Sequence, residues 1–253
     1  MRLEDLHIHI MGIGGAGMSA IARVLRARGA TVTGCDGKAS PVLDALNAEG
    51  ISAYVGHDPA HLAGGDVPVQ ALAPSSAIGK DNAELAAARA QGIPIWHRGD
   101  LLGALMQDKV GIAVAGTHGK STTTSMIATI LMQAELDPSF IIGATPVNLG
   151  TNARHGEGDV FVIEADEYDR TFLRLQPKLA VITNVEFDHP DIYKDFDDTL
   201  KAFTQFVGLV PEDGVVIACE DDDGCVALLK RGAWSVEREI GRASCRERVC
   251  YAV

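Results

Sequence analysis

Apolar positions along the chain follow two alternating periods, one typical of strands and one typical of helices. Residues 7–11 alternate apolar and polar side chains and end at a glycine, whereas the apolar residues of 16–28 recur at helical spacing. The same succession is repeated at 30–36 and 41–50, at 66–78 and 81–92, and at the segments IPIW and DLLGALMQD. Strands that alternate with helices of this length predict a parallel sheet with helices on both faces.

The pattern restarts around residue 108. The segment VGIAVAGTHGKS predicts a strand and a turn that lead into a helix. Further along the chain we expect a helix at 120–134, two apolar strands within 159–169 and 179–189 that each run into an acidic loop, a helix at 197–210 and a strand at 214–223. We therefore expect an α/β protein with a Rossmann-like parallel-sheet domain at 1–107 and a central P-loop ATPase-like α/β domain at 108–230.

The last residues of the chain do not continue this pattern. The segment REIGRASCRER places arginines close together in an otherwise acidic chain, and it resembles translated read-through of a sequencing adapter. We therefore expect residues 231–253 to be a non-native tail that is foreign to the fold.

The charge of the chain argues against two kinds of partner. The net charge is −12 and the pI is about 5.0, whereas nucleic-acid binding favours a basic face and membrane surfaces attract polybasic segments. No apolar run approaches the roughly 18–20 residues of a membrane span, and the charged start does not suit a signal peptide. We expect a cytoplasmic monomer or weak dimer with no nucleic-acid or membrane partner.

The cysteines are odd in number and form no C-x-x-C pair; they are Cys35, Cys219, Cys225, Cys245 and Cys250. Their spacing predicts neither a disulfide framework nor a zinc site. We expect reduced thiols without a special role.

The first glycine turn follows a strand and opens a helix. Gly12, Gly14 and Gly17 form the pattern G-x-G-x-x-G, which lets a backbone approach a diphosphate at a helix N-terminus. Asp36 ends the second expected strand, where a carboxylate can accept a ribose hydroxyl. The motif suits NAD and UDP equally, and a tight turn that needs glycine only for packing would look the same.

The second glycine turn, AGTHGKST, indicates a nucleotide triphosphate. Lys120 can reach the β- and γ-phosphates, and the hydroxyl of Ser121 stands where Mg²⁺ is usually held. Val114 replaces the first glycine of the full P-loop pattern, so the turn is a shorter variant. The expected ATP-binding residues are Gly116, Thr117, His118, Gly119, Lys120, Ser121 and Thr122.

Two acidic loops follow strands of the same expected sheet. They contain Glu164, Asp166, Glu167 and Asp169 in EADEYD, and Glu186, Asp188 and His189 in EFDH. Parallel strands deliver their carboxyl ends to one edge, so these loops should meet Lys120 there and hold Mg²⁺. A solvated acidic rim is the alternative for Asp166, Glu167 and Asp188. An NAD-dependent oxidoreductase has no use for such a cluster.

Several segments, taken in order, resemble the Mur ligase family. They are HIHIMGIGGAGMSAIA, SSAIGKDNAEL, GTHGKSTTT, GTNARHGEGD, EADEYDRTFL and TNVEFDHPDIY, and the resemblance covers about residues 6–230. It is strongest to members that join L-alanine to UDP-N-acetylmuramate in peptidoglycan synthesis, with members that recycle the murein tripeptide as the alternative. The two glycine turns would then hold UDP and ATP.

The resemblance implies roles for single residues. Lys120, Glu164 and His189 would be catalytic, and Ser121, Glu164 and His189 would hold Mg²⁺ while ATP activates the substrate carboxylate as an acyl phosphate. The residues that would bind the UDP substrate are Gly12, Gly14, Gly15, Ala16, Gly17, Asp36, Ser75, Asn152 and Arg154.

Mur ligases have a third domain, but the resemblance of this sequence to the family stops near residue 230. We therefore expect this chain to bind UDP-N-acetylmuramate weakly and to make little product, which leaves a non-catalytic UDP-sugar-binding module as a further alternative.

Overall fold

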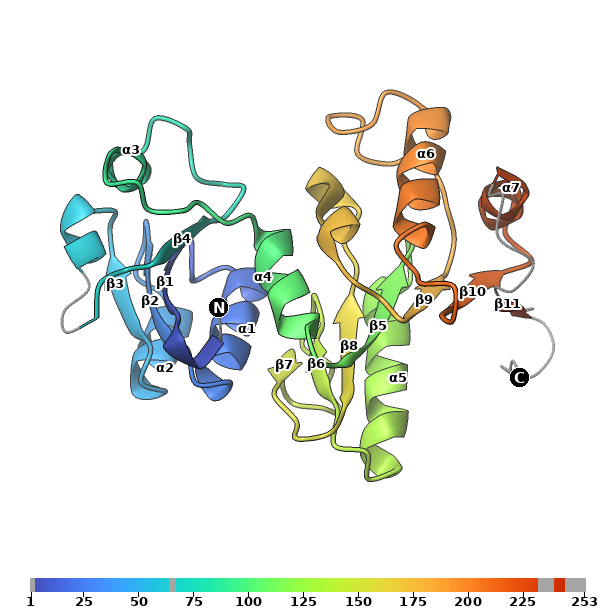
Figure 1. The fold of residues 1–253 in the computed structure, drawn as a ribbon, viewed down its shortest axis with the longest axis horizontal. Coiled ribbons are helices and arrows are strands. Elements are labelled where there is room, and N and C mark those ends of the chain that lie inside the picture. Colours follow the sequence, from blue (N-terminus) through green and yellow to red (C-terminus); the bar gives the residue numbers. More distant parts are fainter. Residues whose placement is uncertain (1–2, 64–66, 232–238, 244–253) are drawn as a thin grey trace. The chain divides into compact units, whose positions relative to one another are not determined.

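The computed structural model describes residues 3–63, 67–231 and 239–243, and it divides the chain into two compact units. One unit consists of residues 1–105 together with 152–155, and the other of residues 106–151 and 156–253. Each unit carries a parallel sheet with helices (Figure 1). The α/β class expected from the alternating pattern is therefore confirmed.

The sheet of the first unit has the strand order β3-β2-β1-β4, with every pair parallel. Its strands are β1 (His7–Met11), β2 (Thr31–Asp36), β3 (Ser52–Val55) and β4 (Ala71–Pro74). Its helices are α1 (Ala16–Ala27), α2 (Pro41–Ala48), α3 (Ala83–Ala90) and α4 (Arg98–Met106), with 3-10 turns η1 (Leu3–Asp5) and η2 (Pro59–Ala63). Strand β1 is buried along its whole length, so the core lies around it.

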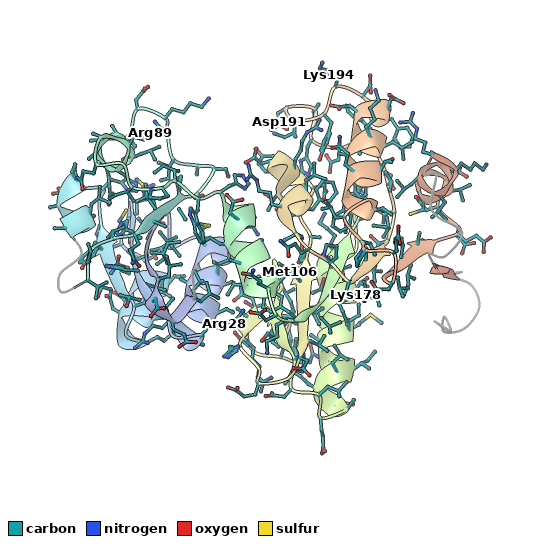
Figure 2. The ribbon with its side chains drawn as sticks, viewed as in Figure 1. Arg28, Arg89, Met106, Lys178, Asp191 and Lys194 are labelled. Carbon is teal, nitrogen blue, oxygen red and sulfur yellow. The ribbon has the colours of Figure 1, made fainter. Side chains whose placement is uncertain are left out.

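Local chemistry explains where these helices begin. Ser40 accepts a hydrogen bond from the Leu43 amide, and Pro41 supplies the fixed φ that suits a first helical position. Asn82 caps α3 through its side-chain oxygen. Arg28, labelled in Figure 2, follows α1 and donates to the carbonyl oxygen of Leu105 at 2.8 Å, which ties α1 to α4.

The strands of the second unit lie in the order β11-β10-β9-β5-β8-β6. They are β5 (Val110–Ala115), β6 (Ser139–Ile141), β8 (Val160–Glu164), β9 (Leu179–Ile182), β10 (Val215–Cys219) and β11 (Glu239–Ala243). The helices are α5 (Lys120–Gln133), α6 (Phe196–Val207) and α7 (Asp223–Arg231), with the 3-10 segment η3 (Tyr168–Arg174). The two-residue strand β7 (Ala153–Arg154) falls within the first unit.

The register of the central strands sets the position of the second glycine turn. Strand β5 pairs with β8 on one side and β9 on the other, so that Val114 lies beside Glu164 and Ala115 beside Ile182. Helix α5 packs against β5 and β8. The loops that follow these three strands therefore emerge at one edge of the sheet.

Some elements differ from the sequence prediction. The strand expected at 66–78 is confined to Ala71–Pro74 among the described residues, and IPIW contributes a single bridge between Leu72 and Ile95. Strands β3 and β6 were not predicted, because four and three residues are too short for a periodic signal. The two apolar strands expected to lead into acidic loops do so, and they end at Glu164 and Ile182.

The expected tail lies mostly outside the described residues. Of residues 231–253 the structure describes Arg231, which ends α7, and β11, which pairs in parallel with β10. That residues 231–253 are foreign to the fold stays a prediction. Among the described residues, no helix combines the length and apolar character that crossing a membrane requires.

Candidate active site

The second glycine turn joins β5 to α5, and the side chain of Lys120 folds back to contact the backbone of this turn. Gly119 precedes the helix with φ of 81°, a left-handed conformation that favours glycine. Lys120 then opens α5, and its Nζ donates to the carbonyl oxygens of Gly116 at 2.7 Å and Thr117 at 3.2 Å. The sequence Gly-Lys-Ser thus places one ammonium group at the start of a helix, the kind of position where backbone amides favour an anion.

Glu167 lies between Lys120 and His189. Lys120 Nζ is 2.8 Å from Glu167 Oε2 and donates to Oε1 at 3.0 Å, while His189 Nε2 is 3.6 Å from Oε1. Glu167 is only 2% exposed, and burial raises the pKa of its carboxyl, although the Lys120 ammonium counters this. A buried carboxylate is tolerated here because a cation lies beside it.

The segment around His189 is held in a strained backbone conformation. His189 has φ of 54°, which a residue other than glycine seldom adopts. Its carbonyl oxygen accepts the amides of Ile192 and Tyr193, and the buried Tyr193 hydroxyl donates to the Glu167 carbonyl oxygen at 2.6 Å. Asp191 and Lys194, labelled in Figure 2, belong to the same connection, which leads from His189 to α6. These bonds fix both acidic loops against one another.

Ser121 and Glu164 form a second pair one residue further along the helix. Ser121 Oγ donates to Glu164 Oε1 at 3.0 Å, and the amide of Gly143 donates to Oε2 at 2.6 Å. A Cβ atom at Gly143 would lie 2.9 Å from both carboxylate oxygens, so only glycine permits this approach. A hydroxyl beside a carboxylate is the oxygen donor set that Mg²⁺ prefers.

His118 is an exposed residue of this turn. Its side-chain Nε2 lies 3.9 Å from Glu186 Oε2, and its amide donates to Asn184 Oδ1 at 2.8 Å. The Asn184 side chain and the Thr183 hydroxyl both donate to the His118 carbonyl oxygen. The loop after β9 therefore braces the glycine turn, while the His118 ring faces solvent.

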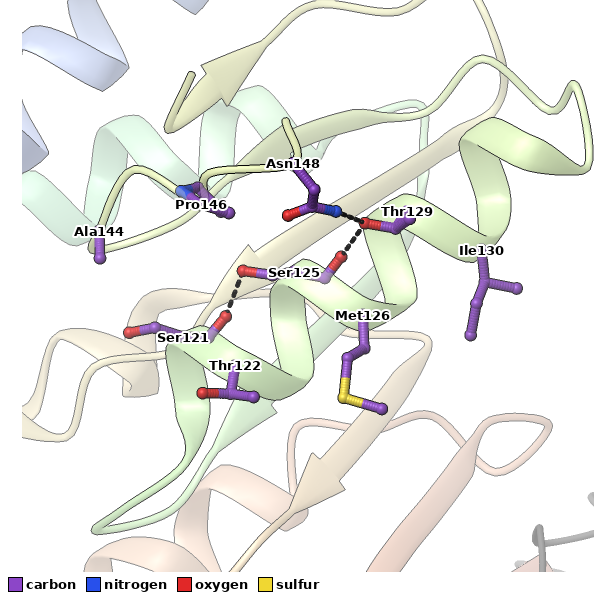
Figure 3. Close-up of a pocket in the computed structure, with 9 residues that line it drawn as sticks. All are labelled: Ser121, Thr122, Ser125, Met126, Thr129, Ile130, Ala144, Pro146 and Asn148. Carbon is purple, nitrogen blue, oxygen red and sulfur yellow. Dashed lines mark hydrogen bonds between the residues drawn. The ribbon is translucent and has the colours of Figure 1, made fainter. Parts of the chain in front are cut away.

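A pocket of about 520 Å³ extends from Ser121 along α5. Figure 3 shows its lining, in which the hydroxyl groups of Ser121, Thr122 and Ser125 lie nearer the start of the helix, and Met126, Thr129 and Ile130 lie further along. The lining residues are Ser121, Thr122, Ser125, Met126, Thr129, Ile130, Ala144, Pro146 and Asn148. Because Ser121 also contacts Glu164, a molecule in this pocket would reach the oxygen pair described above.

The first glycine turn is shaped by the end of β2. The Gly14 amide donates to Asp36 Oδ2 at 3.0 Å, and the Gly12 amide donates to the Cys35 carbonyl oxygen at 2.7 Å. A Cβ at Gly14 would lie 2.9 Å from the Asp36 carboxylate, and one at Gly12 would lie 2.8 Å from Ser75 Cβ. Gly12, Gly14, Asp36 and Ser75 are therefore neighbours in the fold, as the expected UDP site requires.

The remaining expected UDP residues extend along the same unit. Gly15 precedes α1, and Ala16 begins it; the Ala16 carbonyl oxygen accepts a hydrogen bond from Asn152 Nδ2 at 3.2 Å. Arg154 lies two residues further on, in β7, and is half-buried. Asn152 is thus brought to the glycine turn by tertiary structure, because 136 residues separate it from Ala16 in the chain.

Two residues that were not among the expected site residues lie against them, Glu167 and Arg98. Glu167 was weighed as an acidic rim residue, yet it is the partner of Lys120. Arg98 lies beside Gly17, because a Cβ there would be 3.0 Å from its Nη2. By contrast, Asp166 accepts the Tyr168 amide and Asp188 accepts the His189 amide, so each has a backbone partner nearby. No signal in the sequence separates Glu167 from Asp166 and Asp188, and none indicates that Arg98 lies beside Gly17.

Comparison with known proteins gives this geometry a context. The family model described as Mur ligase family, catalytic domain, matches residues 7–110, and the Mur ligase middle domain matches residues 114–240. UDP-N-acetylmuramate–L-alanine ligase of Renibacterium salmoninarum is 48% identical over 250 residues, which cover 98% of this chain and 53% of that protein. The chain thus spans about half the length of the curated relatives it matches.

The solved structures that resemble this chain include Mur ligases as well. UDP-N-acetylmuramate:L-alanyl-gamma-D-glutamyl-meso-diaminopimelate ligase from Neisseria meningitides has a TM-score of 0.85 and 32% identity, covering 94% of this chain and 77% of that one. UDP-N-acetylmuramate-alanine ligase from Thermotoga maritima has a TM-score of 0.78 and 27% identity, covering 96% and 53%. With both domain models in order along its sequence, the chain belongs to the Mur ligase family.

Proposed function

We propose that this chain provides the UDP-substrate site and the ATP site of an enzyme that ligates L-alanine to UDP-N-acetylmuramate. The observation that carries the proposal is the convergence of Lys120, Glu167 and His189 next to Ser121 and Glu164. The similarity to UDP-N-acetylmuramate–L-alanine ligases at 48% identity supports the choice of substrates. In this reaction ATP phosphorylates the substrate carboxylate, and the amine of L-alanine then displaces phosphate.

Lys120 and the helix start supply positive charge for the phosphates of ATP. The ammonium lies at the first residue of α5, where the helix dipole also favours an anion. Phosphoryl transfer depends chiefly on positioning and on neutralising the charge of the transferred group. Glu167 holds the lysine in place from the opposite side, and Gly116, Thr117, Gly119 and Thr122 complete the expected ATP-binding turn.

The donor set around Glu164 fits Mg²⁺. Ser121 and Glu164 would hold the ion through oxygen atoms that already lie 3.0 Å apart. His189 would hold a second ion through its ring nitrogen, which faces Glu167. When bound, Mg²⁺ neutralises phosphate charge and polarises the carboxylate that is activated.

The first glycine turn would bind the UDP portion of the substrate. The start of α1 offers its amides to the diphosphate, and Arg98 adds positive charge beside Gly17. The Asp36 carboxylate lies at this turn, where it can accept a ribose hydroxyl. Asn152 and Arg154 would contact the sugar portion, since they belong to the same unit as the turn.

Calorimetric titration tests the substrate assignment on this chain. We expect UDP-N-acetylmuramate to bind, UDP to compete with it and NAD to have no effect. Failure of UDP-N-acetylmuramate to bind, or competition by NAD, would contradict the proposal. The ligation itself is tested in a version extended to the length of the relatives, as phosphate release that requires both UDP-N-acetylmuramate and L-alanine.

A second candidate reaction uses a tripeptide in place of L-alanine. The similarity in fold to the Neisseria meningitides tripeptide ligase, with a TM-score of 0.85, favours considering it. Offering L-alanine and L-alanyl-γ-D-glutamyl-meso-diaminopimelate separately in the phosphate-release assay distinguishes the two. We expect release with L-alanine and little with the tripeptide.

A further inference from the structure

Four potential metal ligands meet in the first unit, whereas the expected ATP and magnesium residues belong to the second. His9 comes from β1, Cys35 from β2, His61 from η2 and Glu84 from α3. One ligand atom from each lies within 4.8 Å of all the others. Glu84 is at the centre: its Oε1 is 2.9 Å from His9 Nε2 and 3.2 Å from His61 Nδ1, and its Oε2 is 3.1 Å from Cys35 Sγ.

A chain of hydrogen bonds determines which nitrogen of His9 carries a proton. His7 Nδ1 lies 2.7 Å from the Val67 carbonyl oxygen, which can only accept, so His7 donates there. The Thr33 hydroxyl then donates to His7 Nε2 at 3.1 Å and accepts from His9 Nδ1 at 2.9 Å. In the neutral rings this order leaves His9 Nε2 with a bare lone pair.

This lone pair faces another acceptor. His9 Nε2 is fully buried and lies 2.9 Å from the Glu84 carboxylate, yet it makes no hydrogen bond with the described residues. Two acceptors so close together repel one another unless a cation lies between them. The cation is either a proton shared by the pair or a metal ion.

The composition of the cluster favours a metal ion. Two imidazoles, a thiolate and a carboxylate are the donors that Zn²⁺ prefers, and four protein ligands make a closed structural site. Cys35 and Glu84 supply two negative charges, which match a divalent ion and leave a buried site without net charge. Ligand atoms around a tetrahedral zinc ion with bonds of about 2.0–2.3 Å lie about 3.3–3.8 Å apart, within the range that this cluster spans.

We propose that His9, Cys35, His61 and Glu84 form a structural site for zinc. Thr33 supports it as the partner that orients the His9 ring, the role that outer residues play around metal-bound histidines. The ring of Tyr54 stacks on His61 with centroids 4.5 Å apart and covers that ligand. The cysteine spacing predicted no zinc site, because this cluster uses one cysteine and draws its other ligands from three distant elements.

The site would stabilise the turn that is expected to bind UDP. The Cys35 carbonyl oxygen accepts the amides of Gly12 and Ile13, at 2.7 Å and 3.1 Å. The next residue, Asp36, accepts the Gly14 amide. A metal ion bound by Cys35 therefore anchors the strand end on which the glycine turn is built, and links it to η2 and α3.

Metal titration of the full chain, purified without a histidine tag and freed of metal with a chelator, tests this site. We expect one zinc ion to bind per chain and to raise the melting temperature. Co²⁺ in its place should give the visible bands of tetrahedral coordination and a thiolate charge-transfer band in the near ultraviolet. Absence of stoichiometric zinc binding, or an octahedral cobalt spectrum, would overturn the proposal and leave a proton shared by His9 and Glu84.

Variants identify the ligands. Cys35→Ser should abolish the charge-transfer band, whereas Cys225→Ser, which alters a buried thiol of the second unit, should keep it. His61 is partly exposed, so His61→Ala should fold, as checked by circular dichroism, and bind zinc at least about tenfold more weakly. An unchanged zinc affinity in folded His61→Ala, or loss of the band only in Cys225→Ser, would contradict the assignment. These readouts do not depend on UDP-N-acetylmuramate.

Discussion

Glu167 lies 2.8 Å from Nζ of Lys120, and the two side chains are largely buried at the edge of the central sheet. The same glutamate approaches His189 from the other side. This arrangement joins the glycine turn after β5 to the loops after β8 and β9, and it sets the charge that an incoming triphosphate would meet. Removing either member of the pair leaves the other as an unpaired buried charge.

Lys120→Ala should separate the two substrate sites. We expect ATP binding to fall below detection, because the cation for the phosphates is lost, while UDP-N-acetylmuramate binding stays within about twofold. Lys178→Ala is the matched control, since Lys178 pairs with the exposed Asp213 in the same unit. Calorimetry with each ligand provides the measurement. Loss of UDP-N-acetylmuramate binding in Lys120→Ala would show that the two sites are not separate.

A double-mutant cycle should detect the coupling of Lys120 with Glu167. Lys120→Met and Glu167→Gln should each lower the free energy of unfolding, and the double variant should lose less than their sum, by about 1–3 kcal/mol. Urea denaturation measures all four proteins. Strict additivity would mean that the ion pair does not hold the turn.

Gly143→Ala should disturb the expected magnesium site without touching a ligand. The added Cβ would stand 2.9 Å from the Glu164 oxygens and push the carboxylate away from Ser121. We expect Mg²⁺-dependent ATP binding to weaken at least about tenfold, which corresponds to losing one hydrogen bond to a charged group. Gly79→Ala, where a Cβ meets open space, is the control and should bind normally. Normal ATP binding in Gly143→Ala would argue against Glu164 as a ligand.

Arg98→Ala should weaken UDP-N-acetylmuramate binding. Its guanidinium lies beside Gly17 at the start of α1, so its loss removes positive charge from the expected diphosphate site. We expect a loss of about tenfold or more in affinity, measured by calorimetry, with ATP binding unchanged. Arg89→Ala, an arginine of α3 labelled in Figure 2, should have no effect. Equal losses in the two variants would point to a general effect of net charge.

The ion pair between Arg170 and Asp198 should make stability depend on pH. The hydrogen bond from Arg170 lowers the pKa of Asp198 below its ordinary value of 3.8. A carboxyl with a lower pKa in the folded state stabilises it above the unfolded pKa, and this stability is lost as the pH falls through the folded value. Asp198→Asn should therefore melt at a lower temperature than the unmodified protein at pH 7.

The difference in melting temperature should shrink as the pH falls below 3.8. Asp44→Asn, at an exposed position of α2, is the control and should melt like the unmodified protein throughout. A difference that stays constant from pH 7 to pH 3 would mean that Asp198 contributes through packing and not through its charge.

The sequence by itself determined the class of fold and the two glycine turns. Alternating strands and helices leave a strong periodic signal, and each glycine turn draws its residues from one short stretch of the chain, Gly12 with Gly14 and Lys120 with Ser121. Short strands such as β3 and β6 were not predicted, because their few residues carry no periodic signal and neighbouring strands decide their conformation.

Only the tertiary structure decided which distant residues meet these turns. Nothing local in EADEYD distinguishes Glu167, which reaches Lys120, from Asp166, which accepts a backbone amide. The cluster of His9, Cys35, His61 and Glu84 comes from four elements, so no spacing in the chain reveals it. The physical reason is that parallel strands bring the ends of separate segments to one edge, and charge and hydrogen bonding select partners only after the sheet has formed.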